Sequence, residues 1–296
     1  MRHVAPLLLL LLAAAPPATE RTVSGDGVVA ARIGAATLRL RIDPAATAMP
    51  LIHAEAAARA GLKPGMFGIG YRVGPERVTG RTAVARIELG DGTALRRRIG
   101  WTQPHYAPDV DGVIGPGGLD EPVVRFVLGP GRPGERTVAL PMMDQGGMAA
   151  GWGERFARLD VGGQPMRVRF DPHGAHTLAT AGAAARLAQS NGGTLSGKAE
   201  PVPIVFGISR PARPLDLAKP LEVGPLSIAH LLARTADFGS TAGIPDKEAD
   251  PDEVVVVAKG KHDPSRDRLS LGADVLGRCS ALVFDKPAGV VRLTCG

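Results

Sequence analysis

The sequence predicts a mainly β protein that consists of two related lobes with short helices. Residues 31–59 and 157–186 have similar sequences, and each contains an alternating strand, an aspartate at its end and an alanine-rich run. The chain contains 39 Gly, 26 Pro and only 4% aromatic residues, which suits many short strands and turns better than long helices. A repeat of this length is too long for a solenoid and indicates that a whole lobe was duplicated.

The first residues of the chain, 1–19, are predicted to be a secretory signal peptide. A short positive start at Arg2 and His3 precedes an apolar run over residues 7–12, and small residues follow the run. The run is shorter than the roughly 20 residues that span a bilayer. We therefore expect an exported protein, periplasmic or secreted, with no stable membrane anchor after signal cleavage. An uncleaved anchor is the alternative.

The rest of the chain is expected to form two lobes and a connection between them. The predicted boundaries are residues 20–140 for the N-terminal lobe, 141–156 for the connection and 157–296 for the C-terminal lobe. The connection is poor in strand signal. Residues 20–30 are either a short leader or the first strand of the sheet.

In the N-terminal lobe, an alternating strand ends at Asp43 and is followed by a small-residue turn and an alanine-rich run. Residues 83–89 and 94–101 alternate between apolar and polar side chains on either side of a Gly-Asp-Gly-Thr turn, which predicts a hairpin. The glycine-rich segment 65–80 comes before this hairpin and contains further turn signals.

The C-terminal lobe repeats this order with longer insertions. An alternating strand ends at Asp171, and residues 181–189 are predicted to be a short helix that is closed by Asn-Gly-Gly at 191–193. The apolar runs at 202–208 and 221–228 are predicted to be strands.

The two cysteines, Cys279 and Cys295, both lie near the C-terminus. The apolar runs 281–284 and 290–293 flank a strong turn signal, so a hairpin would bring the two thiols almost opposite each other. In an exported chain a disulfide is then the favoured interpretation. Two buried free thiols are the alternative if the chain is not exported.

These features resemble the aspartic peptidases of the pepsin and retropepsin type, particularly the bacterial two-lobed relatives in which one chain carries both halves. In each half of that family a catalytic Asp ends a strand, and a later strand of two apolar residues and a glycine passes beneath its loop. Here the sequence VIG at 113–115 follows Asp43, and LSLG at 269–272 follows Asp171. The family's Asp-Thr-Gly motif is degenerate, since it reads Asp-Pro-Ala after the first strand and Asp-Pro-His after the second.

The resemblance implies a pepsin-like, tandem retropepsin-like fold in which Asp43 and Asp171 face each other as catalytic residues in a cleft between the lobes. Two carboxylates at such a distance share a proton, so one activates water while the other protonates the carbonyl oxygen of a peptide, without a cofactor. The segment 65–80 lies where the family has its flap. Tyr71 in this segment and His173 beside the second aspartate are the candidate substrate-binding residues, although an ordinary surface hairpin would have the same sequence signals.

The segment D-P-H-G-A-H, which contains His173 and His176, is the one candidate metal site that the sequence suggests. A zinc site needs three or four converging ligands, and His53 and His105 are possible distant further ligands. The spacing is weak support for a site, and histidines of a surface loop are the alternative. We therefore expect no metal and no other cofactor.

The remaining composition excludes other classes of function. The formal net charge is +6, but the arginines are spread along strands and form no dense basic block, so nucleic acid is not an expected partner. The chain has no Gly-x-Ser-x-Gly motif of a serine hydrolase. A peptide or protein is the expected partner.

Three interpretations of the aspartate pair remain open. The leading one is hydrolysis of peptide bonds by Asp43 and Asp171. The second is a catalytically degenerate relative that binds peptides or an exported protein partner without turnover. In the third, the aspartates only end strands and cap turns.

Overall fold

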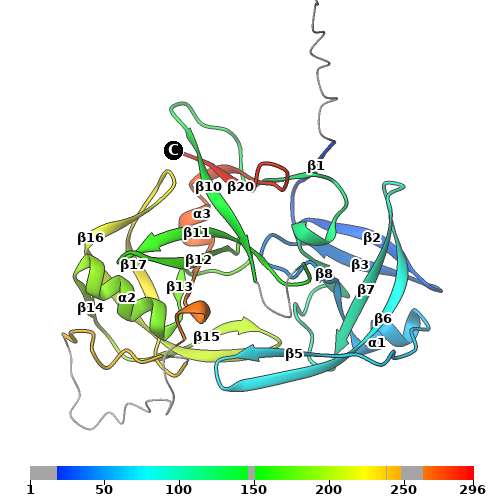
Figure 1. Ribbon diagram of the computed structural model, residues 1–296, viewed down its shortest axis with the longest axis horizontal. Coiled ribbons are helices and arrows are strands. Elements are labelled where there is room, and N and C mark those ends of the chain that lie inside the picture. Colours follow the sequence, from blue (N-terminus) through cyan, green and yellow to red (C-terminus); the bar gives the residue numbers. More distant parts are fainter. Residues whose placement is uncertain (1–18, 146–150, 238, 248–262) are drawn as a thin grey trace, which may run out of the picture.

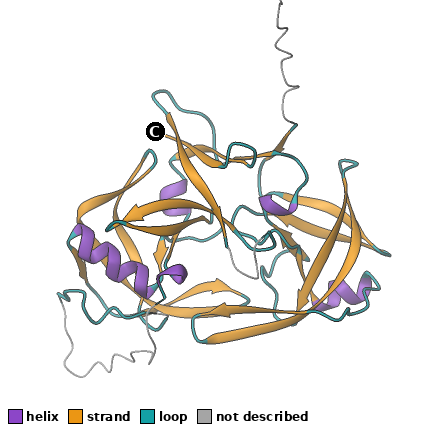
Figure 2. Ribbon diagram, viewed as in Figure 1, coloured by secondary structure: helices purple, strands orange, loops and turns teal. Residues whose placement is uncertain are grey.

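The computed structural model describes residues 19–145, 151–237, 239–247 and 263–296. The predicted signal peptide lies outside these residues, except for Thr19. Strands dominate the described chain and its helices are short, as Figure 2 shows. The prediction of a mainly β, two-lobed protein with short helices is therefore confirmed. None of the helices described is long and apolar enough to cross a membrane.

The N-terminal repeat forms a sheet with seven strands in the described residues, in the order β2-β3-β8-β4-β7-β6-β5. Alternation buries one face at the start of β3, since Leu38 and Leu40 are buried while Thr37 and Arg39 are exposed. The strands are β2 (Val28–Ile33), β3 (Ala36–Ile42), β4 (Leu51–His53), β5 (Gly68–Val73), β6 (Glu76–Leu89), β7 (Ala94–Thr102) and β8 (Gly112–Ile114), with helix α1 (Ala54–Arg59) and the 3-10 turn η1 (Pro116–Gly118).

The other described strands form a second sheet that includes the C-terminal repeat and the first and last strands described (Figure 1). Its strands are β1 (Glu20–Val23), β9 (Val123–Val127), β10 (Arg136–Asp144), β11 (Arg155–Val161), β12 (Gln164–Phe170), β13 (Leu178–Ala179), β14 (Gly193–Leu195), β15 (Glu200–Val205), β16 (Ile208–Val223), β17 (Leu226–Arg234), β18 (Arg268–Leu271), β19 (Cys279–Asp285) and β20 (Val290–Cys295). Helices α2 (Ala181–Asn191) and α3 (Ala273–Leu276) and the 3-10 turn η3 (Pro264–Arg266) belong to the same half.

The two halves of the chain repeat one topology. Strand β3 pairs with β8 in parallel, and β12 pairs with β18 in the same way. Strand β4 lies between β7 and β8, and β13 lies between β17 and β18. Each half also has a helix after its third equivalent strand and two long hairpins after the helix. This order confirms the duplication that the sequence predicts.

Two glycines let strands β8 and β18 end directly beneath the aspartate loops. A Cβ atom on Gly115 would lie 2.1 Å from the Ala46 carbonyl oxygen, and one on Gly272 would lie 2.4 Å from the His176 backbone. Real Cβ atoms do not approach backbone atoms so closely, so neither position accommodates a side chain without moving its loop. Both glycines have the role that the sequence predicts for them.

Two predicted strands of the C-terminal half are wrong. The apolar runs 202–208 and 221–228 each continue through a tight turn, which the structure places at Phe206-Gly207 and Gly224-Pro225. Phe206 adopts a φ of 60°, which is unusual outside glycine. A phenylalanine is not a residue that indicates such a turn, so the sequence did not predict it. Strand β16, which lies between the two turns, contains Pro and Arg residues that hide its strand pattern.

The chain between and around the halves is also extended. Residues 20–23 form strand β1, which pairs in parallel with β9, so this part of the segment belongs to the sheet. The segment expected to connect the lobes contains the end of β10 and the start of β11. Its central part, residues 146–150, lies outside the described residues.

The predicted disulfide between Cys279 and Cys295 is present. The two cysteines lie opposite each other in the hairpin of β19 and β20, which is next to β9 and β10 in the sheet. Both side chains are buried in the hydrophobic core. The bond therefore joins the ends of a hairpin that packs against the middle of the molecule.

Replacement of both cysteines by alanine is expected to lower the free energy of unfolding by about 2–4 kcal/mol, because the bond restricts the unfolded chain. Urea unfolding of the double variant and of the oxidised protein measures the difference. Wild-type protein that has been reduced is the matched control and should unfold with the variant. If all three unfold at the same urea concentration, the bond contributes nothing to stability.

Candidate active site

The two aspartates of the repeat occupy equivalent places in the fold. Asp43 follows the last residue of β3, and Asp171 follows the last residue of β12. The Asp43 N–H donates to the Ile114 carbonyl at 3.0 Å, and the Asp171 N–H donates to the Leu271 carbonyl at 2.8 Å. The parallel neighbours β8 and β18 therefore fix the point at which each aspartate loop begins.

Each carboxylate accepts a backbone hydrogen bond from its own loop. Asp43 Oδ1 accepts the Ala45 N–H at 2.7 Å, and Asp171 Oδ1 accepts the Gly174 N–H at 3.0 Å. The residue after each aspartate is a proline, which has no N–H, so the donors come from further along the loops. Asp43 is only 4% exposed, whereas the side chain of Asp171 is 19% exposed.

The two carboxylates interact electrostatically. Burial raises the pKa of Asp43 above its ordinary value, and the negative charge of Asp171 raises that pKa further. His173, Arg169 and the hydrogen bond from the Ala45 N–H act in the opposite direction without cancelling the rise. Asp43 therefore keeps its proton to a higher pH than an exposed aspartate would.

A buried arginine lies between the aspartate loops. Arg169 belongs to β12, and its Nε donates to the Ala45 carbonyl of the N-terminal half at 3.2 Å. Its Nη2 donates to the Tyr106 hydroxyl at 2.8 Å, and its Nη1 lies 3.6 Å from Asp171 Oδ2. Burial alone would lower the pKa of this guanidinium, but Tyr106, Glu154 and the two aspartates together raise it. Arg169 is therefore a fixed positive charge at this site.

An aromatic group packs beside the Asp43 loop. Tyr71 of β5 and Tyr106 both contact the ring of Phe206, with ring centroids 5.3 Å apart in each pair. The Tyr71 hydroxyl lies 3.4 Å from Thr47 Oγ1, and the Tyr106 hydroxyl donates to the Ala45 carbonyl at 3.2 Å. Burial raises the pKa of Tyr71 to about 12. Both phenols are therefore neutral at ordinary pH and act as hydrogen-bonding groups.

Phe206 comes from the turn of the β15–β16 hairpin, which is the counterpart of the β5–β6 hairpin in the other half. The two hairpins meet at the lower edge of Figure 1, where β5 and β15 come together. Phe206 is 4% exposed, and an ion pair of 3.3 Å between Arg210 and Glu76 joins the same two hairpins. The structure therefore has the hairpins in contact next to the aspartate loops.

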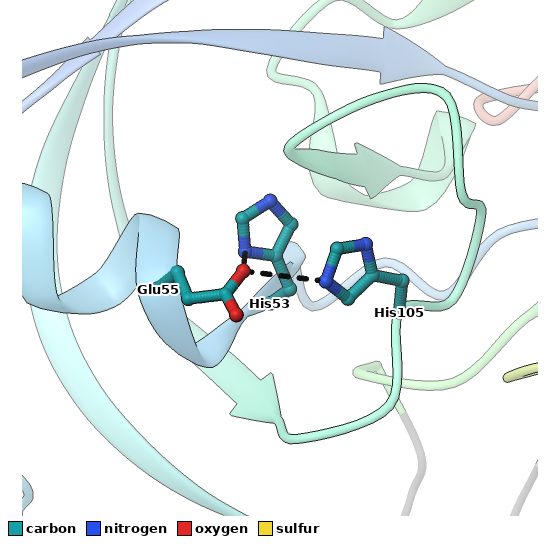
Figure 3. Close-up of side chains that lie close together, drawn as sticks. All are labelled: His53, Glu55 and His105. Atoms are coloured by element: carbon teal, nitrogen blue, oxygen red, sulfur yellow. Dashed lines mark ion pairs between the residues drawn. The ribbon is translucent and has the colours of Figure 1, made fainter.

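The structure brings only some of the predicted histidines together. His173 is exposed in the Asp171 loop, and its charge acts on Asp43. His53 and His105 lie in the other half with Glu55, and these three form the one possible metal-ligand cluster among the described residues (Figure 3). His173 and His176 are not part of it, so the D-P-H-G-A-H segment does not converge with either distant histidine.

The cluster of Figure 3 is better explained as a helix cap than as a metal site. His53 Nδ1 accepts the Ala56 N–H at 3.1 Å at the start of α1, and His53 Nε2 lies 3.2 Å from Asp111 Oδ1. Both ring nitrogens are thus engaged. The rings of His53 and His105 are stacked at 4.1 Å and 9°, whereas a metal lies near the plane of each imidazole that binds it. The stacked rings cannot both meet that requirement without moving.

A pocket lined by small residues lies beside α2, away from the aspartates in the sequence and in the fold. It is lined by Ala188, Gly193, Thr194, Gly243 and Pro245, among others, and by no residue of either aspartate loop. It holds no cluster of titratable groups that would suggest chemistry.

Sequence reasoning found the aspartates but missed the residues that join their loops. Arg169, Tyr106 and Phe206 come from three different elements, and their contacts depend on the packing of the two halves. One signal was available for Arg169, since an arginine precedes each aspartate at the same spacing in both repeats. Tyr106 and Phe206 had no comparable signal.

Comparisons with known proteins add little to this geometry. No family model matches the chain, and no curated protein matches it. Among solved structures, the chain is similar to the aspartic proteinase from Irpex lacteus, with 12% identity, a TM-score of 0.45 and coverage of 90% of this chain and 93% of that one. A likeness this remote carries no argument about activity, so the interpretation of the site depends on the residues themselves.

Asp43→Asn is expected to stabilise the protein at pH 7, because the substitution removes the cost of a buried charge and its repulsion by Asp171. A raised carboxyl pKa contributes stability that is present at low pH and is lost as the pH rises through that pKa. The advantage of the variant should therefore grow from pH 4 to pH 7 in thermal or urea unfolding.

Asp109→Asn is the matched contrast for this measurement. A hydrogen bond from Arg41 lowers the pKa of Asp109, so its contribution to stability is present at neutral pH and is lost as the pH falls. The asparagine variant at this position should lose stability at pH 7. A stability difference for Asp43→Asn that does not change with pH would contradict the raised pKa.

Proposed function

We propose that the protein is an aspartic-peptidase-like hydrolase that cleaves peptide bonds with water activated by Asp43 and Asp171. The observation that carries the proposal is the electrostatic coupling of two carboxylates at equivalent strand ends, one of them buried with a raised pKa. Such a pair can hold one proton and one negative charge, which is the state that acid–base chemistry on water requires.

The roles follow from the different surroundings of the two carboxylates. Asp171, the more exposed member, takes a proton from water as the water oxygen bonds to the peptide carbonyl carbon. Asp43 gives its proton to the carbonyl oxygen. When the C–N bond breaks, the leaving nitrogen takes the proton from Asp171, and the hydroxyl proton of the intermediate returns to Asp43. The reaction consumes one water and regenerates the starting protonation state.

The substrate-binding roles of Tyr71 and His173 belong to the same proposal. Tyr71 lies in a hairpin that contacts the opposite hairpin through Phe206, and its hydroxyl is 3.4 Å from Thr47 Oγ1 in the Asp43 loop. His173 is exposed on the Asp171 loop and would meet the part of a peptide that extends past that loop. Both roles fit an extended peptide that lies between the two halves.

We also propose that the protein acts after export, in the periplasm or outside the cell. The support is the disulfide between Cys279 and Cys295, since disulfides persist in oxidising compartments. The apolar N-terminal run of the sequence fits the same location.

A second candidate function is binding of a peptide or an exported protein without turnover. The observation in its favour is the loss of both Asp-Thr-Gly motifs together with the guanidinium of Arg169 beside Asp171. A cation at this place can balance a carboxylate that no longer activates water. The two candidates differ in whether a bound peptide is cut.

Cleavage of a diverse peptide library from pH 3 to pH 8 tests the leading proposal. Asp43→Asn and Asp171→Asn are each expected to reduce cleavage by about 10²–10⁴-fold, because each removes one proton-transfer group. Activity should fall as the pH rises through the raised pKa of Asp43, because the acid then loses its proton. Asp109→Asn serves as a control and should retain cleavage.

Folded wild-type protein that cuts no peptide at any pH would exclude the hydrolase. Peptides retained by wild-type protein but released by Asp171→Asn would then support the binding function. The same library, analysed for binding as well as for products, gives both results.

A further inference from the structure

Each repeat has an arginine at the same position in the strand before its aspartate. Arg41 lies in β3 and Arg169 lies in β12, and both are buried, with 6% and 4% exposed. A buried guanidinium is costly unless its donors are paired. The two arginines therefore need partners, and the structure gives them different ones.

The partners of Arg41 all belong to its own half. Its guanidinium forms an ion pair with Asp109 through Nη2, and its Nε donates to the Asp26 carbonyl at 3.2 Å. Asp109 lies between β7 and β8, and Asp26 lies between β1 and β2. Arg41 thus holds loops of the N-terminal half together, and among its hydrogen-bond partners in the described chain there is no residue of the other half.

The partners of Arg169 lie in both halves. Nε donates to the Ala45 carbonyl and Nη2 donates to the Tyr106 hydroxyl, both in the N-terminal half. Nη1 faces Asp171 at 3.6 Å, and Nε is 3.5 Å from Glu154. One side chain therefore connects the Asp171 carboxylate to the backbone of the Asp43 loop.

Ala45 is the residue through which this connection reaches Asp43. Its carbonyl accepts hydrogen bonds from Arg169 and from Tyr106, at 3.2 Å each. Its N–H donates to Asp43 Oδ1 at 2.7 Å. The guanidinium thus holds the carbonyl on one side of the Ala45 Cα, and the N–H on the other side of the same Cα binds the Asp43 carboxylate.

The prolines after both aspartates explain why such a connection is needed. Pro44 and Pro172 have neither a hydroxyl nor an N–H, so neither can donate a hydrogen bond from one aspartate loop to the other. Arg169 supplies several donors in a rigid plane. Two of these donors reach the opposite half, which compensates for the donors that the prolines lack.

The charges at this site are also balanced when the aspartate pair holds one proton. Arg169 and Arg268 both face Glu154, with Arg268 Nη1 at 3.3 Å from its carboxylate. Two guanidinium charges then face the charge of Glu154 and one charge on the pair. His173 and the neutral Tyr106 also act on Asp43 or Arg169, and the buried Arg234, which pairs with Asp237, interacts with the charge of Arg169.

We propose that Arg169 is the positioning residue of this site, which ties the two aspartate loops together through the Ala45 carbonyl and balances one negative charge on the aspartate pair. This inference depends on the proposed function for its effect on activity. Its effect on the titration of Asp43 does not require activity. Arg41, at the equivalent position of the other repeat, serves only its own half.

The test uses Arg169→Met and Arg169→Lys, with Arg41→Met and Arg41→Lys as matched controls. In Arg169→Met the loops lose their connection, so kcat should fall by about 10²-fold while KM changes little, because misplaced catalytic groups slow the chemical step. Loss of the positive charge should also move the alkaline limb of the pH profile upward by about one pH unit.

The lysine variant separates charge from geometry. A lysine keeps the positive charge but lacks the planar fork that reaches both Ala45 and Tyr106. Arg169→Lys should therefore keep the alkaline limb in place while kcat remains low. If Arg169 had only a structural role, both substitutions would lower stability. Neither would then shift the alkaline limb of the pH profile or change kcat of the folded protein.

A second readout keeps the inference testable if no peptide is cleaved. The free energy of unfolding is measured from pH 3 to pH 8 for the protein with Asp43 and for the Asp43→Asn variant. The pH at which the difference between the two is half complete reports the titration of Asp43. This midpoint should move upward by about one pH unit in the Arg169→Met background and stay unchanged in the Arg41→Met background. Equal midpoints in both backgrounds would overturn the inference, whereas absence of cleavage alone would overturn only the proposed function.

Discussion

Two carboxylates at the ends of equivalent strands interact electrostatically, and a charge on the buried one, Asp43, is costly. Asp43 is buried and Asp171 is close enough to raise its pKa. Strands β8 and β18 end close beneath the aspartate loops. Gly115 and Gly272 permit this approach, because a Cβ atom at either position would collide with the loop backbone. Hydrogen bonds within each loop and a guanidinium between the loops contact the two carboxylates and the Ala45 carbonyl.

Duplication gives the two halves one topology, but the side chains at equivalent positions have diverged. Arg41 pairs with Asp109 inside its half, whereas Arg169 reaches across to Ala45. The two hairpins also carry different side chains at their contact. Phe206 at the turn of the β15–β16 hairpin packs against Tyr71 of the β5–β6 hairpin. The asymmetry of the aspartate pair, one member buried and one partly exposed, follows from these differences between the halves.

The sequence alone predicted the elements that depend on short stretches of residues. Alternation, the Asp-Pro turns, the Gly-Asp-Gly-Thr hairpin and the cysteine spacing each have a short-range physical cause, and the corresponding elements are present. The prediction of one strand in each of the runs 202–208 and 221–228 was wrong, because residues typical of strands continue through a tight turn in each run. Arg169 and Tyr106 could not be assigned, since a buried arginine finds its partners only when two halves of the chain pack together.

Asp43 keeps its proton to a higher pH because it is buried and because the negative charge of Asp171 acts on it. Carboxyl carbon NMR of the folded protein from pH 3 to pH 8 measures this directly, with Asp171→Asn as the comparison. The account predicts that Asp43 titrates above the ordinary range of an aspartate and moves back toward it when Asp171 is replaced. An Asp43 signal that titrates in the ordinary range, or one that does not respond to Asp171→Asn, would contradict it.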